Sequence, residues 1–217
     1  VSAVSLITGE STSDSFMPFD LQVLRKALTI SLSPTETQVT YGNQAEFDLV
    51  GTGFATGETL ETLGITAVSS KATGNKYTYT NISFDGSTFK LTTPDTFVSD
   101  VYNITIESIT ATNKGNYTIT FEGAELTVGK RAITLKPNNN TKVYDGTPLY
   151  AAEVGGSKVG IIAGSVFSKD TLTADATGSI TNAGKITTNA VTSYVFKRGG
   201  VDVTDCYNVS LLTGTLE

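Results

Sequence analysis

The chain has 217 residues, a formal net charge of −6 and a pI near 4.7, and no basic stripe interrupts this acidic balance. Neutralisation of phosphates dominates nucleic-acid affinity, so we expect no binding to DNA or RNA. No apolar run approaches the roughly 20 residues that span a bilayer, so this segment is not expected to insert into a membrane. Hydrophobic residues at 39% and charged residues at 17% are typical of a folded chain with a modest core.

The first part of the chain is predicted to consist of short strands. Alternating apolar and polar residues predict strands at 28–33, 46–51, 76–83, 89–93, 101–108 and 117–121. Clusters of Gly, Asn, Asp and Ser separate them and predict turns. Residues 56–64 are the one helix candidate, with Thr56 as the N-cap and Gly64 at the end, and they allow one or two turns.

The second part shows the same kind of pattern. Strands are predicted at 132–136, 150–154, 185–188, 191–197 and 207–211. The Arg-Gly-Gly sequence at 198–200 predicts a hairpin turn, because glycine adopts positive φ without a steric clash. The glycine-rich stretch 155–164 combines apolar and small residues without a clear period, so no element is assigned there.

A short motif occurs three times and divides the chain. LQVLRKALTI at 21–30 returns as LTVGKRAITL at 126–135, and residues 216–217 begin it again, with spacings of 105 and 90 residues. Repeats of this kind mark the junctions of modules. We therefore predict the tail of a preceding module at 1–26, a β module at 27–130 and a second β module at 131–217, each with its own apolar interior. No Gly/Ser/Pro spacer separates them, so neighbours are expected to dock with restricted freedom.

These elements predict an all-β fold, with two tandem antiparallel Ig-like β-sandwich modules. The alternative is a β-grasp-like α+β module, in which one short helix crosses a small sheet. Residues 56–64 would supply that helix in the first module, but the second module has no equally good counterpart, which favours the sandwich.

Tyrosines next to turns suggest structural roles. Tyr41 and Tyr144 each precede a turn that contains glycine, and we expect both rings to pack inward. Asp145 is expected to bond its own backbone in an Asx-turn. Tyr117 and Tyr207 stand at strand entrances, where a tyrosine corner returns its hydroxyl to the backbone.

The sequence contains few patterns that indicate a catalytic, cofactor-binding or metal-binding site. It contains no histidine, so the usual Ser-His-Asp and Cys-His machinery is missing and no enzyme is predicted. Cys206 is the only cysteine and is interpreted as a half-buried structural thiol. The glycines of GTGFATG at 51–57 have the wrong spacing for a dinucleotide loop. No cofactor and no metal site is predicted. The acidic pairs do not follow the EF-hand spacing, although a calcium site in a loop stays an alternative; these pairs are Asp95 with Asp100, Asp170 with Asp175, and Asp202 with Asp205.

Tyr77 and Tyr79 are the only candidate ligand-binding residues. They alternate along one predicted strand, so both rings share a face and form a possible platform for a glycan. The chain has no Trp, and burial of this face in the core is the favoured alternative.

The recurring motifs resemble repeat modules of bacterial surface proteins. KVYDGTP at 142–148, GGVDVTDCYN at 199–208 and GTL at 214–216 resemble YDG-type modules. In the first module, VTYGN at 39–43 and GNYTITF at 115–121, followed by GAEL, resemble the related YG-type modules, often called MBG domains. Cys206 and the missing Asp of the first module depart from the YDG pattern.

The resemblance implies an extracellular or cell-surface protein of bacteria that is built from tandem repeats and is adhesin-like, without general catalytic activity. We therefore expect a non-enzymatic segment that serves as a stalk or spacer in adhesion, with neighbouring repeat modules of the same polypeptide as partners. The alternative is an adhesin-type binding module that recognises a glycan or a host extracellular protein.

Overall fold

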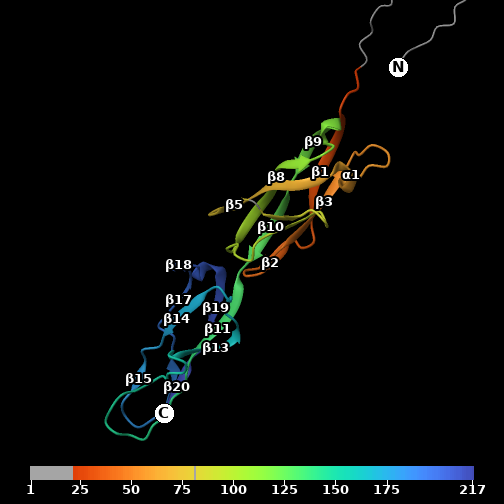
Figure 1. Ribbon diagram of the computed structural model, residues 1–217. Coiled ribbons are helices and arrows are strands. Elements are labelled where there is room, and N and C mark those ends of the chain that lie inside the picture. The colour runs from red at the N-terminus through yellow and green to blue at the C-terminus, as the bar shows by residue number, and fades with distance from the viewer. Residues whose placement is uncertain (1–21, 81) are drawn as a thin grey trace, which may run out of the picture.

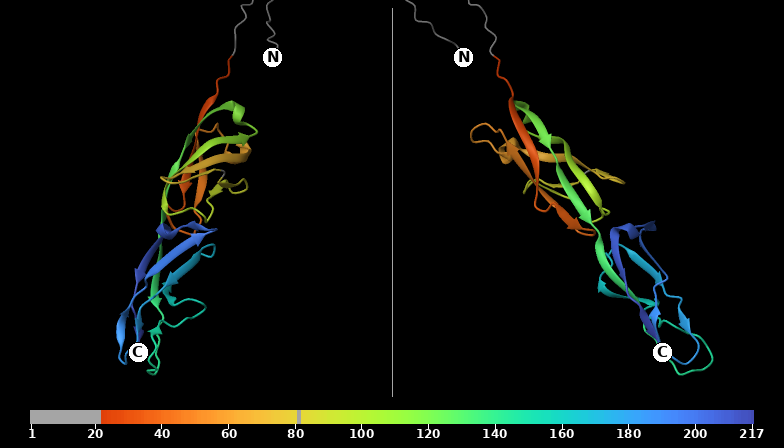
Figure 2. Two further views of the ribbon diagram at one scale, coloured as in Figure 1. Left: turned by 90° about the vertical axis from the view of Figure 1, so that its left-hand side faces the viewer. Right: turned by 180° about the vertical axis from the view of Figure 1, so that it is seen from behind.

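The computed structural model describes residues 22–80 and 82–217, and this part of the chain is mainly β. Figure 1 shows an elongated molecule in which two groups of strands follow one another end to end, and both views of Figure 2 agree. Each sheet belongs either to residues 26–129, here called the N-terminal unit, or to residues 131–217, the C-terminal unit. The predicted all-β class is confirmed. Most of the predicted tail at 1–26, namely 1–21, lies outside the described residues.

The N-terminal unit is a sandwich of two five-stranded sheets. One sheet runs in the order β6 (Ser83–Asp85), β7 (Lys90–Thr92), β3 (Glu46–Thr52), β1 (Lys26–Pro34) and β9 (Tyr117–Glu122). The other runs in the order β2 (Gln38–Thr40), β10 (Ala124–Gly129), β8 (Asp100–Ala111), β4 (Ile65–Thr73) and β5 (Thr78–Thr80). Alternation places the apolar side chains of β1, β3 and β8 on buried faces, as expected for half-buried strands.

Most strand pairs are antiparallel, but β1 runs parallel to β9 and β2 runs parallel to β10. The sheets are therefore mixed, which corrects the expectation of purely antiparallel sheets. The cause is the path of the chain, which leaves β8 in one sheet, forms β9 in the other and returns to form β10 beside β8. This path places β9 next to the first strand in the same direction.

The C-terminal unit divides its strands among four smaller sheets. They are β13 (Val159–Gly164) with β11 (Arg131–Pro137) and β19 (Tyr207–Leu211); β12 (Leu149–Tyr150) with β15 (Ser179–Ile180); β14 (Thr171–Asp175) with β17 (Ser193–Arg198) and β18 (Val201–Asp202); and β16 (Ile186–Asn189) with β20 (Gly214–Leu216). The predicted turn at 198–200 joins β17 to β18, with φ values of 53° and 90° at its two glycines.

The first strands of the two units have equivalent neighbours. β1 pairs antiparallel with β3 and parallel with β9, and β11 pairs antiparallel with β13 and parallel with β19. Lys26 lies opposite Tyr117 in one unit, and Arg131 lies opposite Tyr207 in the other. A 3-10 turn precedes each tyrosine, η1 (Lys114–Asn116) and η2 (Thr204–Cys206). The repeated sequence motif therefore corresponds to a repeated local structure.

The helix candidate is a single turn, α1 (Leu60–Leu63). Its N-cap is Thr59 and not the predicted Thr56, because Thr59 and Thr62 form a reciprocal capping box. Gly64 ends the helix as predicted, in the left-handed conformation with φ of 68°. One turn does not cross a sheet, so the β-grasp alternative lacks its helix. Across residues 22–80 and 82–217, no helix is long and apolar enough to cross a membrane.

Several strand predictions needed correction. The predicted strand at 76–83 is reduced to β5 and the first residue of β6, and the predicted strand at 150–154 to the end of β12. Several strands have no predicted counterpart, and the longest of them are β4, β10, β13 and β14. β13 occupies part of the glycine-rich stretch at 155–164.

The buried side chains do not divide as the sheets do. One contiguous apolar cluster includes Tyr41 and Phe97 of the N-terminal unit together with Phe167, Phe196 and Tyr207 of the C-terminal unit. This corrects the expectation that each unit has a separate interior, because aromatic rings from the two units contact each other at the junction. The boundaries of the modules stay a prediction.

Candidate functional site: the junction between the units

The two units are joined by the shortest possible connection. β10 ends at Gly129 and β11 begins at Arg131, so Lys130 is the only residue between these strands. In Figure 1 the chain passes straight from β10 into β11. An extended connection of one residue gives little room for pivoting, and the contacts on either side of it determine whether the units move independently.

The N-terminal unit contributes Tyr41, which follows the short strand β2. The backbone N–H of Tyr41 donates to the carbonyl of Gly129 at 2.8 Å, so the end of β10 positions it directly beside the junction. Its side chain is fully buried, at 0% exposure. Gly42 comes next with φ of 93°, and a Cβ atom there would lie 2.7 Å from a ring carbon of Phe167. Glycine is therefore needed at position 42 both for the backbone and for the approach of Phe167.

The C-terminal unit contributes a carboxylate, Asp170, whose side chain is completely buried. One of its oxygens, Oδ2, accepts hydrogen bonds from the hydroxyls of Tyr41 and Tyr207, each at 2.8 Å. The other, Oδ1, accepts from Nε of Arg198 at 2.9 Å. A buried charge is tolerated when it is paired and hydrogen-bonded, and Asp170 meets both conditions.

Arg198 completes the cluster from the end of β17. Its Nη2 donates to the Tyr41 hydroxyl at 2.6 Å, and its Nη1 donates to the carbonyl of Thr96 at 2.8 Å. The guanidinium also lies 4.9 Å from the ring centroids of both Tyr41 and Phe167, in cation–π range. A single arginine of one unit therefore binds a side chain and a backbone carbonyl of the other unit.

Burial and the carboxylate change the acidity of these groups. Burial, followed by the hydrogen bond to Asp170, raises the pKa of Tyr41 well above its ordinary value, and burial also raises the pKa of Tyr207. Burial is the largest influence on Arg198 and would lower its pKa, but the hydrogen bond to Asp170 together with electrostatic interactions with Tyr41, Asp170 and Cys206 outweighs burial, so the net shift is upward. At neutral pH the cluster thus holds two neutral phenols and one ion pair.

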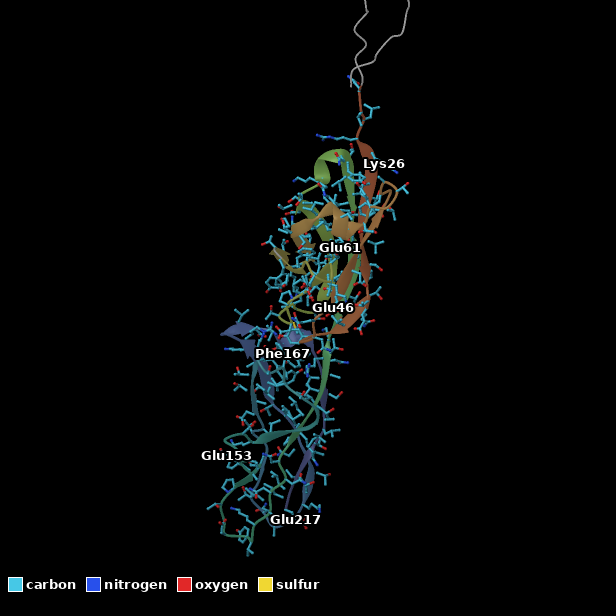
Figure 3. The ribbon with its side chains drawn as sticks, turned by 45° about the vertical axis from the view of Figure 1, so that its right-hand side comes forward. Lys26, Glu46, Glu61, Glu153, Phe167 and Glu217 are labelled. Atoms are coloured by element: carbon cyan, nitrogen blue, oxygen red, sulfur yellow. The ribbon has the colours of Figure 1, made fainter. Side chains whose placement is uncertain are left out.

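Aromatic packing surrounds this polar cluster. The ring of Tyr41 meets Phe167 edge to face at 5.8 Å and Tyr207 at 5.5 Å, and Tyr207 stacks on Phe196 at 3.8 Å. Figure 3 labels Phe167 at the narrow region between the two units. Interfaces whose centre holds Tyr, Phe and Arg with few unpaired polar groups have the composition of energetic hot spots.

Two ion pairs lie at the rim of the junction. Lys169 contacts Asp95 at 2.7 Å and Lys76 contacts Asp205 at 3.3 Å, in each case joining one unit to the other. Both pairs are substantially exposed, so each contributes at most about 1 kcal/mol to stability. They help to fix the orientation of the units more than they add energy.

Arg131, the first residue of β11, forms hydrogen bonds to both units. Its Nη1 donates to the carbonyl of Tyr41 at 3.2 Å, and its Nε donates to the carbonyl of Ser165 at 2.9 Å.

Cys206 is also buried at the junction. Its sulfur accepts the N–H of Ser99 at 3.4 Å, and burial raises the pKa of its thiol. The thiol therefore takes part in the contact between the units.

The predicted tyrosine roles are met at three positions of four. The hydroxyl of Tyr117 accepts the N–H of Ala55 and that of Tyr207 accepts the N–H of Phe167, each at 3.0 Å, as in a tyrosine corner. Tyr41 is buried as predicted. The prediction for Tyr144 was wrong, because Tyr144 is 62% exposed and does not pack inward. The predicted Asx-turn is confirmed by the hydrogen bond from the Thr147 N–H to Asp145, at 2.9 Å.

The candidate ligand residues Tyr77 and Tyr79 lie near each other but in different surroundings. Their ring centroids are 6.5 Å apart, and Tyr77 is 45% exposed. Tyr79 instead stacks on Phe97 at 4.1 Å and is partly buried against the core. A ligand role for this pair stays a prediction.

The acidic pairs serve separate structural purposes. Asp95 binds Lys169, Asp100 accepts backbone N–H groups of Asn75 and Lys76, and Asp202 accepts the N–H of Thr204. Within the described residues no group of three or more His, Cys, Asp or Glu is placed to hold a metal ion.

Comparison with known proteins adds no identification. No protein-family model matches the chain, and no curated protein matches it at a significant level. The resemblance to MBG and YDG-type modules therefore stays a prediction that depends on the quoted motifs.

Proposed function

We propose that this chain is a non-enzymatic tandem-repeat segment of a bacterial cell-surface or secreted protein, and that it acts as a rigid spacer in adhesion. The observation that supports this function best is the buried Tyr41–Asp170–Arg198 cluster, which joins the two units across a connection of one residue. A spacer keeps a distant binding part at a fixed distance only if its modules do not fold back on one another. A docked junction gives the chain this property.

The composition of the junction supports a fixed geometry. A mobile hinge needs few buried contacts and many solvated polar groups. Here each polar group of the cluster has a partner from the other unit or from its own. Separating the units would expose an ion pair and several aromatic rings at once, and it would leave Gly42 without the ring that it packs against.

The sequence supports the other parts of the proposal. The absence of histidine removes the commonest general base, and the carboxylates described above are occupied by structural partners. The cell-surface location depends on the motif resemblance, and a protein of this kind needs elongated modules, as the end-to-end arrangement in Figure 2 illustrates.

Small-angle X-ray scattering tests this function on the full chain. We compare the wild type with a variant that has Gly-Ser-Gly-Ser inserted after Lys130, and with a control that has the same insertion in the exposed loop after Asn182. The wild type and the control should each fit one elongated particle, whereas the junction variant should require an ensemble of bent shapes. Scattering of the wild type that itself requires pivoting units would contradict the spacer function.

A further inference from the structure

The side chain of Tyr41 enters a site of the C-terminal unit that is formed by Phe167, Asp170 and Tyr207 and is here called the junction socket. This socket has a counterpart at the opposite end of the N-terminal unit. In the C-terminal unit the Tyr207 hydroxyl accepts the N–H of Phe167 and donates to Asp170. In the N-terminal unit the Tyr117 hydroxyl accepts the N–H of Ala55 and donates to Glu58. The two arrangements contain the same groups, a tyrosine, a backbone N–H and a carboxylate, on equivalent elements. The Ala55–Glu58–Tyr117 site is here called the N-terminal socket.

The residue that fills the junction socket also has a counterpart. Thr127 donates its N–H to the carbonyl of Thr37 at 2.9 Å, and Glu217, the matching residue of the repeated motif, donates to the carbonyl of Asn140 at 3.1 Å. Thr37 and Asn140 are therefore equivalent, and four residues further on stand Tyr41 and Tyr144.

These two tyrosines differ in what covers them. Tyr41 is buried by the C-terminal unit at 0% exposure, whereas Tyr144 is 62% exposed and its neighbour Val143 is 90% exposed. Tyr144 also lines an open cavity of about 310 Å³ together with Leu149, Ile180 and Glu217. Figure 3 shows Glu217 near the far end of the C-terminal unit. This end thus exposes an aromatic ring, that of Tyr144, at the position that is buried at the internal junction.

The turn after each tyrosine indicates which socket fits it. Gly42 follows Tyr41, and any side chain there would collide with Phe167. Asp145 follows Tyr144, so this turn does not fit a socket that contains a phenylalanine. The N-terminal socket has Ala55 where the junction socket has Phe167, so it has no aromatic ring at the position that would collide with Asp145.

The residues that precede β1 also match the internal junction. Lys26 and Arg131 occupy equivalent register positions, so Val23 corresponds to Val128. Val128 is 2% exposed within β10, whereas Val23 is 92% exposed. Placing Val23 directly after Glu217 reproduces the spacing of the repeated motif, because LE followed by VLRK matches LTVGKR.

We propose that the exposed end of the C-terminal unit, formed by Val143, Tyr144 and Asp145, is a docking surface for the N-terminal socket of another copy of this chain joined in tandem. Tyr144 donates its hydroxyl hydrogen to Glu58 of the next copy, as Tyr41 does to Asp170. This contact is head to tail, so it extends the array in one direction without closing a ring. The inference rests on the proposed spacer function, because it extends the same kind of junction to the next repeat.

A tandem chain tests the proposal. Residues 23–217 of a second copy are joined directly to Glu217 of the first, and the second copy carries Tyr144→Phe so that Tyr144 comes from the first copy alone. Tetranitromethane nitrates exposed tyrosines, and mass spectrometry of the digest reports Tyr144 and Tyr41 separately. A further tandem chain carries Ala55→Phe in the second copy, which places a large ring against Asp145.

We expect Tyr144 to be nitrated readily in the single chain and to lose this reactivity in the tandem chain, down to the level of the buried Tyr41. The Ala55→Phe change should restore nitration of Tyr144, and the unfolding midpoint of the single chain with Ala55→Phe shows whether that variant folds. Nitration of Tyr144 that is equal in the single and tandem chains, while Tyr41 stays protected, would overturn the docking surface and leave the spacer function intact. Nitration of Tyr41 as well would overturn both.

Discussion

The hydroxyl of Tyr41 donates a 2.8 Å hydrogen bond to the carboxylate of Asp170, which lies 129 positions later in the sequence and in the other unit. The bond is buried, and Arg198 binds both of its partners. This contact links the two units at the centre of the junction.

Replacing Asp170 with alanine should lower the free energy of unfolding by about 3–5 kcal/mol, because Arg198 then keeps a buried charge without its partner. Urea denaturation measures the loss. Asp175→Ala is the matched control, since that carboxylate is 47% exposed and pairs only loosely with Lys158, and its loss should stay below about 1 kcal/mol. Equal losses for the two variants would contradict the account.

Replacing Gly42 with alanine should destabilise the chain both through its backbone conformation and through collision with Phe167. Gly57→Ala separates these effects, because Gly57 also has positive φ, at 82°, but no atom lies within 4 Å of its added Cβ. We expect Gly42→Ala to cost more than Gly57→Ala. The excess should shrink in a Phe167→Ala background, with a coupling energy of about 0.5–3 kcal/mol in a double-mutant cycle. Additive effects of the Gly42 and Phe167 substitutions on the free energy of unfolding would mean that a side chain at position 42 does not contact Phe167.

Stability should fall as the pH rises above about 10, where free tyrosine ionises. Tyr41, Tyr207 and Tyr102 are buried and their pKa values are raised, so the folded chain keeps phenolic protons that the unfolded chain has lost. The unfolded state then binds fewer protons, and each such tyrosine lowers the free energy of unfolding by about 1.4 kcal/mol per pH unit.

Denaturation curves between neutral pH and the alkaline range measure this slope. Tyr41→Phe removes one of the three phenols, so its stability should decline less steeply above pH ~10 than that of the wild type. An identical slope for the variant would show that the Tyr41 hydroxyl is not protected by the junction.

The two candidate ligand tyrosines should respond differently to truncation. Tyr79→Ala removes a ring stacked on Phe97 and should cost about 2–3 kcal/mol of stability, whereas Tyr77→Ala should change it by less than about 0.5 kcal/mol. Thermal unfolding of the two variants gives the comparison. Any glycan-array signal that Tyr77→Ala abolishes while the protein stays folded would assign a ligand role to Tyr77, and a blank array for the wild type would argue against a glycan.

Strands with an undisturbed period of two could be predicted from the sequence. β1 buries Leu28, Ile30 and Leu32 in strict alternation, and its predicted bounds are close to the observed ones. β4 has no predicted counterpart because its pairing with β8 shifts register between Ile65 and Ala67, where β4 carries an extra residue. The buried residues Ile65 and Val68 are therefore three positions apart, and the period of two begins only at Val68.

The junction could not be predicted in detail, because its members are distant in sequence and each has an ordinary local interpretation. In the sequence Asp170 pairs with Asp175 as a nearby acidic residue, and Arg198 begins a hairpin turn. The available signal was a tyrosine before a glycine-containing turn downstream of each copy of the repeated strand, Tyr41 and Tyr144, together with a connection without a spacer. It indicated docking but not which carboxylate and guanidinium carry out the docking.

The contacts of the junction should hold the two units in one relative orientation in solution. Residual dipolar couplings of backbone amides test it most directly, with residues 26–129 and 131–217 fitted separately to an alignment tensor. The docked junction should give tensors of the same magnitude and orientation for the two units of the wild type. A clearly smaller tensor for one unit would show that it pivots about Lys130, and would contradict the rigid junction.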